Sequence, residues 1–449
     1  MKGCKNCAIY KKRIQQLEEE VAYLKFELEQ LRHLRYKKGR KRKSLKPEEA
    51  RPKKKRGILG HLGFFRKKPK RVDKITEIRL TRCPECGSKD ITKCRQVEEH
   101  IQEDIVLPER EVTLYRRYHY YCKRCKKVIT AKGKDELAKS YIGPKAKALA
   151  AFMKYGIKIS DRDIKKIFEK VFKLKISASS IVGFREQLKK KGYPTYQKLK
   201  QALRKTKFLH VDETGWKVEG KNRWVWKLSN KRVCITHIDE SRGQKVIEEI
   251  LGKAYQGILI SDFLSAYNKI EAKGKQRCLV HMLRELDKVI DYWEDDEEVI
   301  RYCRKLKQIF EGAISLYKRY QAKDWDEAYY KRRQILVQRL EDFKFSNSNK
   351  RVLQRFVKRL NRHRDELFTF LYYKGIDYHN NHIEQQIRQD VIFRKITYGN
   401  RSGKGVENHN VLMSILQTAK LNKLEPLEVF EKILTLNGNF HLLPSTLPP

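Results

Sequence analysis

The sequence predicts a multidomain α/β protein whose largest domain is a mixed sheet with helices on its faces and an all-helical insertion. Two patterns predict this fold class. Near the middle of the chain, three consecutive apolar runs indicate strands, and strands then alternate with helical segments. A long charged stretch with helical periodicity follows. Smaller domains precede this one, because 449 residues suit two to four domains of the usual ~100–200 residues.

The composition points to a polyanionic partner. The chain has 103 Lys and Arg against 55 Asp and Glu, which gives a formal net charge of +48. Nucleic acid is the commonest partner of so basic a protein, and an anionic membrane surface is the alternative. No apolar run approaches the ~18 residues of a membrane helix, and no apolar signal core follows Met1. We therefore expect a cytoplasmic, nucleoid-associated protein.

A heptad repeat predicts a coiled-coil helix over residues 8–35. Its apolar a and d positions are Ile14, Leu17, Val21, Leu24, Leu28 and Leu31. About three heptads are marginal for an isolated helix and more plausible in a dimer. The alternative is a single amphipathic helix that packs on its own domain.

Residues 36–71 predict a basic disordered linker. The segment contains Lys/Arg runs, such as residues 40–43 and 53–56, and few core residues. Blocks of like charge stay extended. We expect the segment to neutralise DNA phosphates without reading base sequence. A purely solubilising linker is the alternative.

Residues 72–135 predict a small zinc-binding β domain. Two C-x-x-C pairs flank a strand-rich insert, and their thiols are Cys83, Cys86, Cys122 and Cys125. Four thiolates without an open position make a structural tetrahedral Zn²⁺ site. The spacing of these cysteine pairs is typical of metal ligands in a reducing compartment and not of a disulfide framework. A third pair, Cys4 and Cys7, has no partner in the sequence, and we favour no metal there.

Residues 140–200 predict a helix-turn-helix-like DNA-binding region. Three runs with helical periodicity start near Gly143, Ser160 and Ser177, and Ser160 is placed as an N-cap. Short helices with a tight joint and a Ser-rich start are typical of a unit whose recognition helix enters the major groove. Many helical linkers share this pattern, and that alternative stays open.

Residues 205–435 predict the mixed α/β domain, and residues 436–449 a tail. The expected strands cover residues 208–212, 223–228, 232–238, 257–262 and 276–281. Helices are expected at residues 244–251, 264–271, from about 381, 406–421 and 427–434. The charged residues 285–372 contain one glycine and no proline, and they predict the all-helical insertion.

Two expected strands end in an aspartate, Asp212 and Asp262, and a third acid, Glu384, lies one turn inside an expected helix. Acids at the tips of neighbouring strands converge, because strands are only ~4.8 Å apart. Unpaired carboxylates repel one another, and Mg²⁺ or Mn²⁺ ions remove the repulsion. Two such ions serve phosphoryl transfer. Each acid alone could be a solvated loop residue, but the three together predict a metal site.

Several segments resemble the catalytic core of bacterial insertion-sequence transposases. They are residues 209–216 (LHVDETGW), 222–226 (NRWVW), 261–267 (SDFLSAY) and 278–281 (CLVH). The C-terminal block is similar to the insertion sequence 66 transposase family of the DDE class. It comprises residues 380–388 (NNHIEQQIR), 394–395 (RK), 398–403 (YGNRSG) and 418–426 (TAKLNKLEP). The resemblance covers most of the chain and implies an RNase H-like core with a helical insertion before the third acid.

The resemblance also implies roles for individual residues. The catalytic metal ligands would be Asp212, Asp262 and Glu384. The residues near them would be Cys278, His281, Asn381 and Arg388. The DNA-binding residues would be Arg394, Lys395, Arg401 and Lys404. One departure is that Tyr378 and His379 stand where many relatives carry an acidic residue.

Two of these assignments leave alternatives open. His281 could orient or exchange a proton with a phosphate or a carboxylate, or form a buried structural pair with Cys278. Arg388, four residues after Glu384, could pair with that carboxylate or hold a phosphate. The loop at residues 399–405 resembles a phosphate-contacting loop, and a solvated turn is the competing interpretation.

These features predict a DNA transposase. It would bind the terminal inverted repeats of its element, hydrolyse a phosphodiester with Mg²⁺ and transfer the released 3′-OH to target DNA. Two alternatives are a catalytically inactive DNA-binding regulator derived from a transposase and a structure-specific nuclease without strand transfer. Synapsis of two ends requires at least a homodimer, and accessory proteins encoded by the same element would be further partners.

Overall fold

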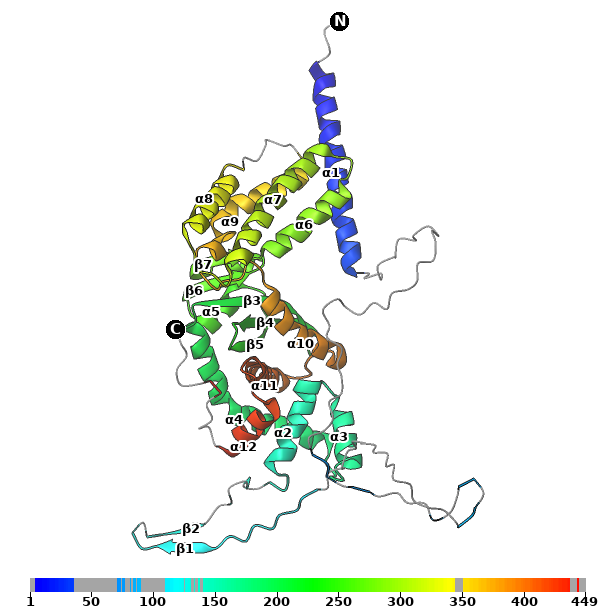
Figure 1. Ribbon diagram of the computed structural model, residues 1–449, viewed down its shortest axis with the longest axis vertical. Helices are drawn as coiled ribbons and strands as arrows, with labels where there is room; N and C mark the ends of the chain where they lie inside the picture. Colours follow the sequence, from blue (N-terminus) through cyan, green and yellow to red (C-terminus); the bar gives the residue numbers. More distant parts are fainter. Residues whose placement is uncertain are drawn as a thin grey trace. The chain divides into compact units, whose positions relative to one another are not determined.

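The computed structural model describes residues 5–35, 140–343 and 350–436, parts of 71–137, and residues 442–443 (Figure 1). It divides into two compact units, residues 1–32 with 109–449 and residues 33–108. The predicted basic linker lies almost wholly outside the described residues. So do three ligands of the predicted zinc site, Cys83, Cys86 and Cys125. The fourth, Cys122, ends strand β1 (His119–Cys122), which pairs with β2 (Lys127–Thr130) as an antiparallel hairpin.

A five-stranded mixed sheet lies at the centre of the larger unit, in the order β5-β4-β3-β6-β7. Its strands are β3 (Phe208–Val218), β4 (Lys221–Ser229), β5 (Cys234–Asp239), β6 (Ala254–Ser261) and β7 (Glu271–Arg277). The first three form an antiparallel meander, and β6 runs parallel to both β3 and β7. Glu219 and Gly220, both at positive φ, form the two-residue turn between β3 and β4. The mixed sheet predicted from the sequence is confirmed and fits an RNase H-like core.

Three local predictions in this sheet were wrong. The strand expected to end at Asp212 continues to Val218, so Asp212 lies within β3 and not at its tip. The helix expected at residues 264–271 is only a 3-10 turn, Ser265–Tyr267, and β7 starts at Glu271. Eight residues of apolar periodicity are too few to separate a single turn from a helix. The strand expected at residues 276–281 ends at Arg277, because Cys278 caps a helix that begins at Leu279.

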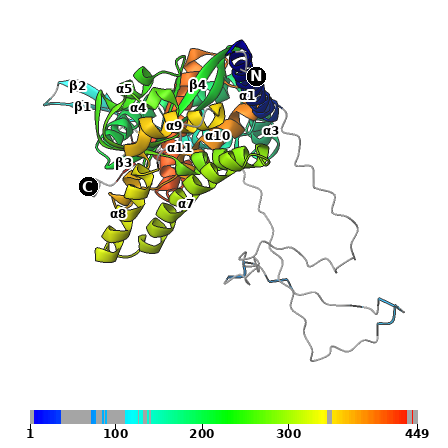
Figure 2. The same ribbon diagram turned by 90° about the horizontal axis from the view of Figure 1, so that it is seen from above.

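The predicted insertion is helical. Its helices are α6 (Leu279–Tyr292), α7 (Glu297–Tyr320), α8 (Glu327–Glu341) and α9 (Arg351–His363), followed by 3-10 turns at Arg364–Glu366 and Thr369–Leu371. Asp296 and Asp326 cap α7 and α8 by accepting backbone N–H groups. Helices α7 and α8 lie side by side in both views (Figures 1 and 2). The core of the insertion includes Ile258 and Ile260 of β6, so the insertion packs on the sheet.

A second core joins the sheet to another group of helices. These are α4 (Ala178–Arg204), α5 (Gln244–Leu251), α11 (Gly403–Leu421) and α12 (Pro426–Thr435). Polar side chains of α11 also cover the edge strand β5. Asn410, Ser414 and Thr418 accept the backbone N–H groups of alternate β5 residues at 3.0, 2.8 and 3.1 Å. An exposed strand edge invites unwanted pairing, and α11 closes this one.

The region expected to resemble a helix-turn-helix contains α2 (Pro144–Phe152), a π-helical turn (Met153–Ile157), α3 (Asp161–Lys170) and the first half of α4. Ser160 caps α3 as predicted, because its Oγ accepts the N–H of Asp163 at 3.2 Å. The second half of α4 contributes Leu199 and Leu203 to the core beside the sheet. A role of this region in reading DNA stays a prediction.

The N-terminal helix α1 (Lys5–Arg35) covers the predicted coiled-coil segment. None of the described helices is long and apolar enough to cross a membrane.

Candidate active site

Asp212 and Asp262 lie at corresponding positions of two neighbouring strands. β3 and β6 run parallel, and their register pairs His210 with Ile260. Each aspartate follows its paired residue by two positions, so the two residues lie at the same level of neighbouring strands. Neighbouring strands of a sheet are ~4.8 Å apart. The register thus places the two aspartates on neighbouring strands, and their sharing of a metal ion stays a prediction.

Helix α10 (Asn381–Thr397) brings the third acid to the same face. Leu209 and Val211 belong to the core beside α4 and α11. Because successive side chains of a strand point to opposite faces, Asp212 points to the other side. There α10 packs against β3 and β4, with Glu384 in its first turn.

The three acids influence one another electrostatically. Burial raises the pKa of the Asp212 carboxyl well above its usual value of 3.8, and the charges of Glu213, Asp262 and Glu384 raise it further. The backbone N–H of Glu213 donates to Asp212 Oδ1 at 3.0 Å and opposes this shift. A divalent cation would relieve such repulsion.

Glu213, which follows Asp212 in the sequence, has contacts of its own on the opposite face of the sheet. Its side chain is 2% exposed and forms an ion pair with Arg242 at 2.7 Å. The hydroxyl of Tyr267, which is completely buried, also donates to it. These contacts give Glu213 a structural role on the face opposite to Asp212.

Several polar atoms around Glu384 lack hydrogen-bond partners. Nε2 of His281, in the first turn of α6, lies 3.8 Å from Glu384 Oε1. In the described part of the chain, the buried side-chain atoms without a hydrogen-bond partner include Glu384 Oε1, His281 Nδ1, Asn381 Oδ1 and His379 Nδ1. Buried polar groups are rarely left unpaired in folded proteins. An unpaired oxygen such as Glu384 Oε1 could bind a cation. An unpaired imidazole nitrogen such as His281 Nδ1 could bind a cation or, as an N–H, a phosphate.

Asn380 and Cys278 join the elements that carry the acids. The backbone N–H of Cys278 donates to Ser261 O at 2.8 Å, next to Asp262. The N–H of Asn380 donates to Cys278 Sγ at 3.2 Å, and the Asn380 amide donates to Val211 O at 2.9 Å, next to Asp212. Asn380 is completely buried. Sequence analysis placed Cys278 near the site but missed Asn380, although the Asn-Asn pair before the helix was a signal.

Sequence analysis also missed two histidines, His210 and His382, next to these contacts. His210 Nδ1 lies 3.0 Å from Asn380 Oδ1, and its Nε2 lies 3.5 Å from Asp377 Oδ2. Burial lowers the pKa of His382 to about 4, so this imidazole is neutral at pH 7. Its Nε2 contacts Asn230 O at 2.9 Å. These contacts fix the chain just before and within the start of α10.

The predicted basic residues differ in their surroundings. Arg388 is exposed on α10 and, among the described residues, forms no ion pair with Glu384. Arg394 donates a hydrogen bond to the carbonyl oxygen of Gly215 in β3, so it holds α10 to the sheet. Lys395, Arg401 and Lys404 are exposed. Their contact with DNA stays a prediction.

The loop that carries Arg401 is fixed to the end of β3. The N–H of Asn400 donates to Lys217 O, and Asn400 O accepts the N–H of Glu219, both at 2.9 Å. Trp216 Nε1 donates to Asn400 Oδ1 at 2.7 Å. Gly399 has a φ of +105°, and a Cβ there would collide with the Lys217 carbonyl. The start of the loop is therefore fixed to the sheet, whereas residues 401–404 are exposed, and a contact of theirs with phosphate stays a prediction.

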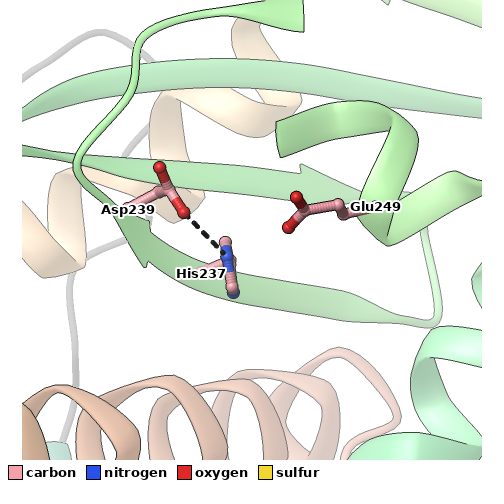
Figure 3. A group of neighbouring side chains, drawn as sticks. All are labelled: His237, Asp239 and Glu249. Carbon is pink, nitrogen blue, oxygen red and sulfur yellow. Dashed lines mark ion pairs between the residues drawn. The ribbon is translucent and has the colours of Figure 1, made fainter. Parts of the chain in front are cut away.

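A different group of possible metal ligands lies closer together than Asp212, Asp262 and Glu384 do. His237 and Asp239 of β5 and Glu249 of α5 place one ligand atom each within 4.8 Å of one another (Figure 3). Among the described residues, no other group of three such side chains meets this distance. Burial and then the charge of Lys200 lower the pKa of His237. Strand β4 separates this group, which sequence analysis missed, from Asp212.

Comparison with known protein families gives a match over most of the described chain. A model of the IS66 transposase family matches residues 139–408, which is more than half of the chain. This span includes all five strands of the sheet, the helical insertion and the three acids. No curated protein matches the chain.

Proposed function

Because the chain belongs to the IS66 transposase family, we propose that Asp212, Asp262 and Glu384 form the active site of a DNA transposase. The observation that carries this proposal is their arrangement: two aspartates at one level of adjacent parallel strands, and a glutamate on the helix packed over them. Such an enzyme would cleave DNA at the ends of its element and join the released 3′-OH to target DNA.

The donor set fits divalent cations. Carboxylate oxygens are the ligands that Mg²⁺ and Mn²⁺ prefer, and Glu384 Oε1 lacks a hydrogen-bond partner among the described residues. Asp212, Asp262 and Glu384 would hold the ions. When bound, these would activate a water and neutralise charge on the scissile phosphate. Burial and the charges of neighbouring acids raise the pKa of Asp212, and a bound cation would oppose this shift.

The protein's own groups position the reacting DNA. His281 lies beside Glu384 and has an open Nδ1, which in its N–H form could donate to a phosphate oxygen. The exposed Lys395, Arg401 and Lys404 would neutralise backbone phosphates near the site. The Asn380–Cys278 joint would keep the three acids at fixed spacing, as positioning residues and not as catalytic ones.

A structural zinc site in residues 72–135 and binding of terminal repeats by residues 140–200 belong to the same proposal. They rest on the sequence pattern. One zinc per chain, measured by metal analysis of the purified protein and lost in a Cys83→Ser/Cys86→Ser variant, would support the first of them.

A plasmid carrying two element ends tests the proposal. With Mg²⁺ and target DNA, the native chain should produce joined products, whereas a nuclease would only nick and an inactive regulator would leave the plasmid intact. Glu384→Gln should abolish cleavage and keep end binding. The neighbouring, exposed Gln385→Glu is the matched control and should cleave normally. Cleavage by the Glu384 variant at the native rate would refute the assignment.

A further inference from the structure

A histidine and an aspartate of β5 lie on the face of the sheet that turns away from Asp212. Glu213 of β3 pairs with Trp226 of β4, which in turn pairs with His237 of β5. Cross-strand partners point to the same face of a sheet, so His237 shares the face of Glu213, opposite to Asp212. Asp239, two residues further along β5, lies on that face too. These two side chains are therefore separate from the proposed active site.

With Glu249 of α5, these side chains are close enough to share one ion. We call His237, Asp239 and Glu249 the β5 cluster. The three side chains point toward one another, their ligand atoms lie within 4.8 Å of each other, and His237 Nε2 lies 3.7 Å from Asp239 Oδ2 (Figure 3). Two ligands of one Zn²⁺ ion, each ~2.0–2.2 Å from it, are at most ~4.4 Å apart. His237 and Asp239 already meet this limit, and the exposed Glu249 side chain needs only a small movement to meet it.

Other contacts hold the ligands of the cluster in place. The backbone N–H of Ser241 donates to Asp239 Oδ1 at 2.7 Å, which orients this carboxylate and leaves Oδ2 toward His237. The Arg204 side chain of α4 donates to the Glu249 carbonyl oxygen at 3.0 Å and so holds the end of α5. Hydrogen bonds that orient a ligating side chain are typical of metal sites.

The cluster keeps an unbalanced negative charge. Within the described part of the chain, the carboxylate of Glu249 forms no ion pair and accepts no hydrogen bond, because only its carbonyl oxygen is used. The positive charge of Lys200 acts on both His237 and Glu249 but forms no ion pair with either among the described residues. One ammonium beside two carboxylates leaves a net charge that attracts a cation.

We propose that the β5 cluster binds one divalent transition-metal ion, with Zn²⁺ or Co²⁺ as its ligand class. One imidazole and two carboxylates suit these ions better than they suit Mg²⁺, which prefers oxygen ligands alone, and Mn²⁺ forms the weakest complexes of the transition series. Three protein ligands leave a coordination position for water. The ion would join the edge strand β5 to α5, the crossover helix that leads into β6. This inference does not rest on the proposed active site.

The first test is a calorimetric titration of the full chain with Zn²⁺ in excess Mg²⁺, which occupies sites made of carboxylates alone. His237→Gln and Glu249→Gln should each weaken the binding of one ion by at least about 100-fold, because loss of a ligand exceeds the ~10–100-fold cost of losing an outer hydrogen bond. Glu240→Gln removes an exposed carboxylate next to Asp239 and is the matched control, with native affinity. All these chains contain the same cysteines, so a difference between them reports on the cluster. Native zinc affinity and stoichiometry in Glu249→Gln would overturn the proposal.

The second test measures the thermal unfolding midpoint with and without added Zn²⁺, again in excess Mg²⁺. Because Glu249 is exposed, Glu249→Gln should unfold without added metal at the native midpoint. Added Zn²⁺ should raise the midpoint of the native chain and of Glu240→Gln more than that of Glu249→Gln, since the ion binds only the folded cluster.

Asp262→Asn locates the ion in the same two experiments. This variant should keep the zinc of the β5 cluster, because Asp262 is not one of its ligands. Loss of this zinc in Asp262→Asn, together with its retention in Glu249→Gln, would place the ion at the three acids and overturn the proposal.

Discussion

The backbone N–H of Asn380 donates a hydrogen bond to the sulfur of Cys278 at 3.2 Å, although the two residues are 102 positions apart. Through this contact, the start of α10 is tied to the start of α6 and to the end of β6. The Asn380 amide continues the connection to Val211 of β3. This buried asparagine thus links the elements that carry Asp212, Asp262 and Glu384.

Asn380→Ala should destabilise the chain by about 2 kcal/mol or more, because Val211 O and the His210 imidazole lose buried partners. It should also raise the Mg²⁺ concentration needed for cleavage. Denaturant unfolding and a metal titration of the cleavage rate measure the two effects. Asn381→Ala is the control for the stability measurement alone, since Asn381 Oδ1 has no hydrogen-bond partner in the described chain. Equal stability loss in both variants would contradict the positioning role.

A buried ion pair gives a prediction for α10 as a whole. Lys227 Nζ lies 2.6 Å from Asp390 Oδ2, both residues are fully buried, and His409 Nε2 lies 2.8 Å from Asp390 Oδ1. Lys227→Met leaves an uncompensated carboxylate and should cost about 3–5 kcal/mol in unfolding free energy. Lys221→Met, on the same strand but exposed, should change it by less than about 0.5 kcal/mol. Comparable losses in both variants would contradict the account.

The same ion pair predicts a direction for acid unfolding. Burial would raise the pKa of Asp390, but the charge of Lys227 and the hydrogen bond from His409 outweigh it and hold the pKa below its usual 3.8. The pair therefore contributes stability above about pH 4 that is lost as the pH falls through the lowered pKa. Native and Lys227→Met stabilities, measured by urea unfolding, should converge at low pH.

Gly399→Ala should displace the loop that carries Arg401. A Cβ would meet the Lys217 carbonyl, and the φ of +105° is strained for alanine. We expect a loss of about 1–3 kcal/mol in stability and weaker binding of DNA ends. Gly403→Ala is the control, because nothing lies within 4 Å of its Cβ position. Gel-shift titration measures binding, and native binding by the Gly399 variant would count against a role for this loop.

The double variant Arg401→Gln/Lys404→Gln should bind all DNA sequences less tightly. Each lost phosphate contact should reduce the slope of log affinity against log salt by about 1. Lys323→Gln, exposed in the insertion, is the matched charge control and should leave the slope unchanged. An unchanged slope in the double variant would remove these two residues from the DNA interface.

The sequence predicted the elements whose signals are local. Asp212 and Asp262 became candidate metal ligands because each follows a short apolar run in the sequence, and that assignment stays a prediction. The Ser160 cap was predicted correctly because N-caps have a sequence signature. The helix expected at residues 264–271 was wrong because a buried 3-10 turn and a short helix have the same apolar spacing.

Long-range contacts explain most of what the sequence did not predict. Nothing near Asn380 in the chain indicates that its partners are Cys278 and Val211. The heptad pattern predicted α1 but not the burial of Tyr23 and Phe26. His237 and Glu249 approach only through the packing of α5 on the sheet.

Binding of Mn²⁺ to the full chain, measured by calorimetric titration of three proteins, tests the central claim most directly. The native chain and Asp239→Asn should both bind Mn²⁺, whereas Asp262→Asn should lose most of the bound metal, because Asp262 belongs to the proposed site. Loss of binding in Asp239→Asn together with native binding in Asp262→Asn would place the metal at His237 and its neighbours. That result would contradict the proposed active site.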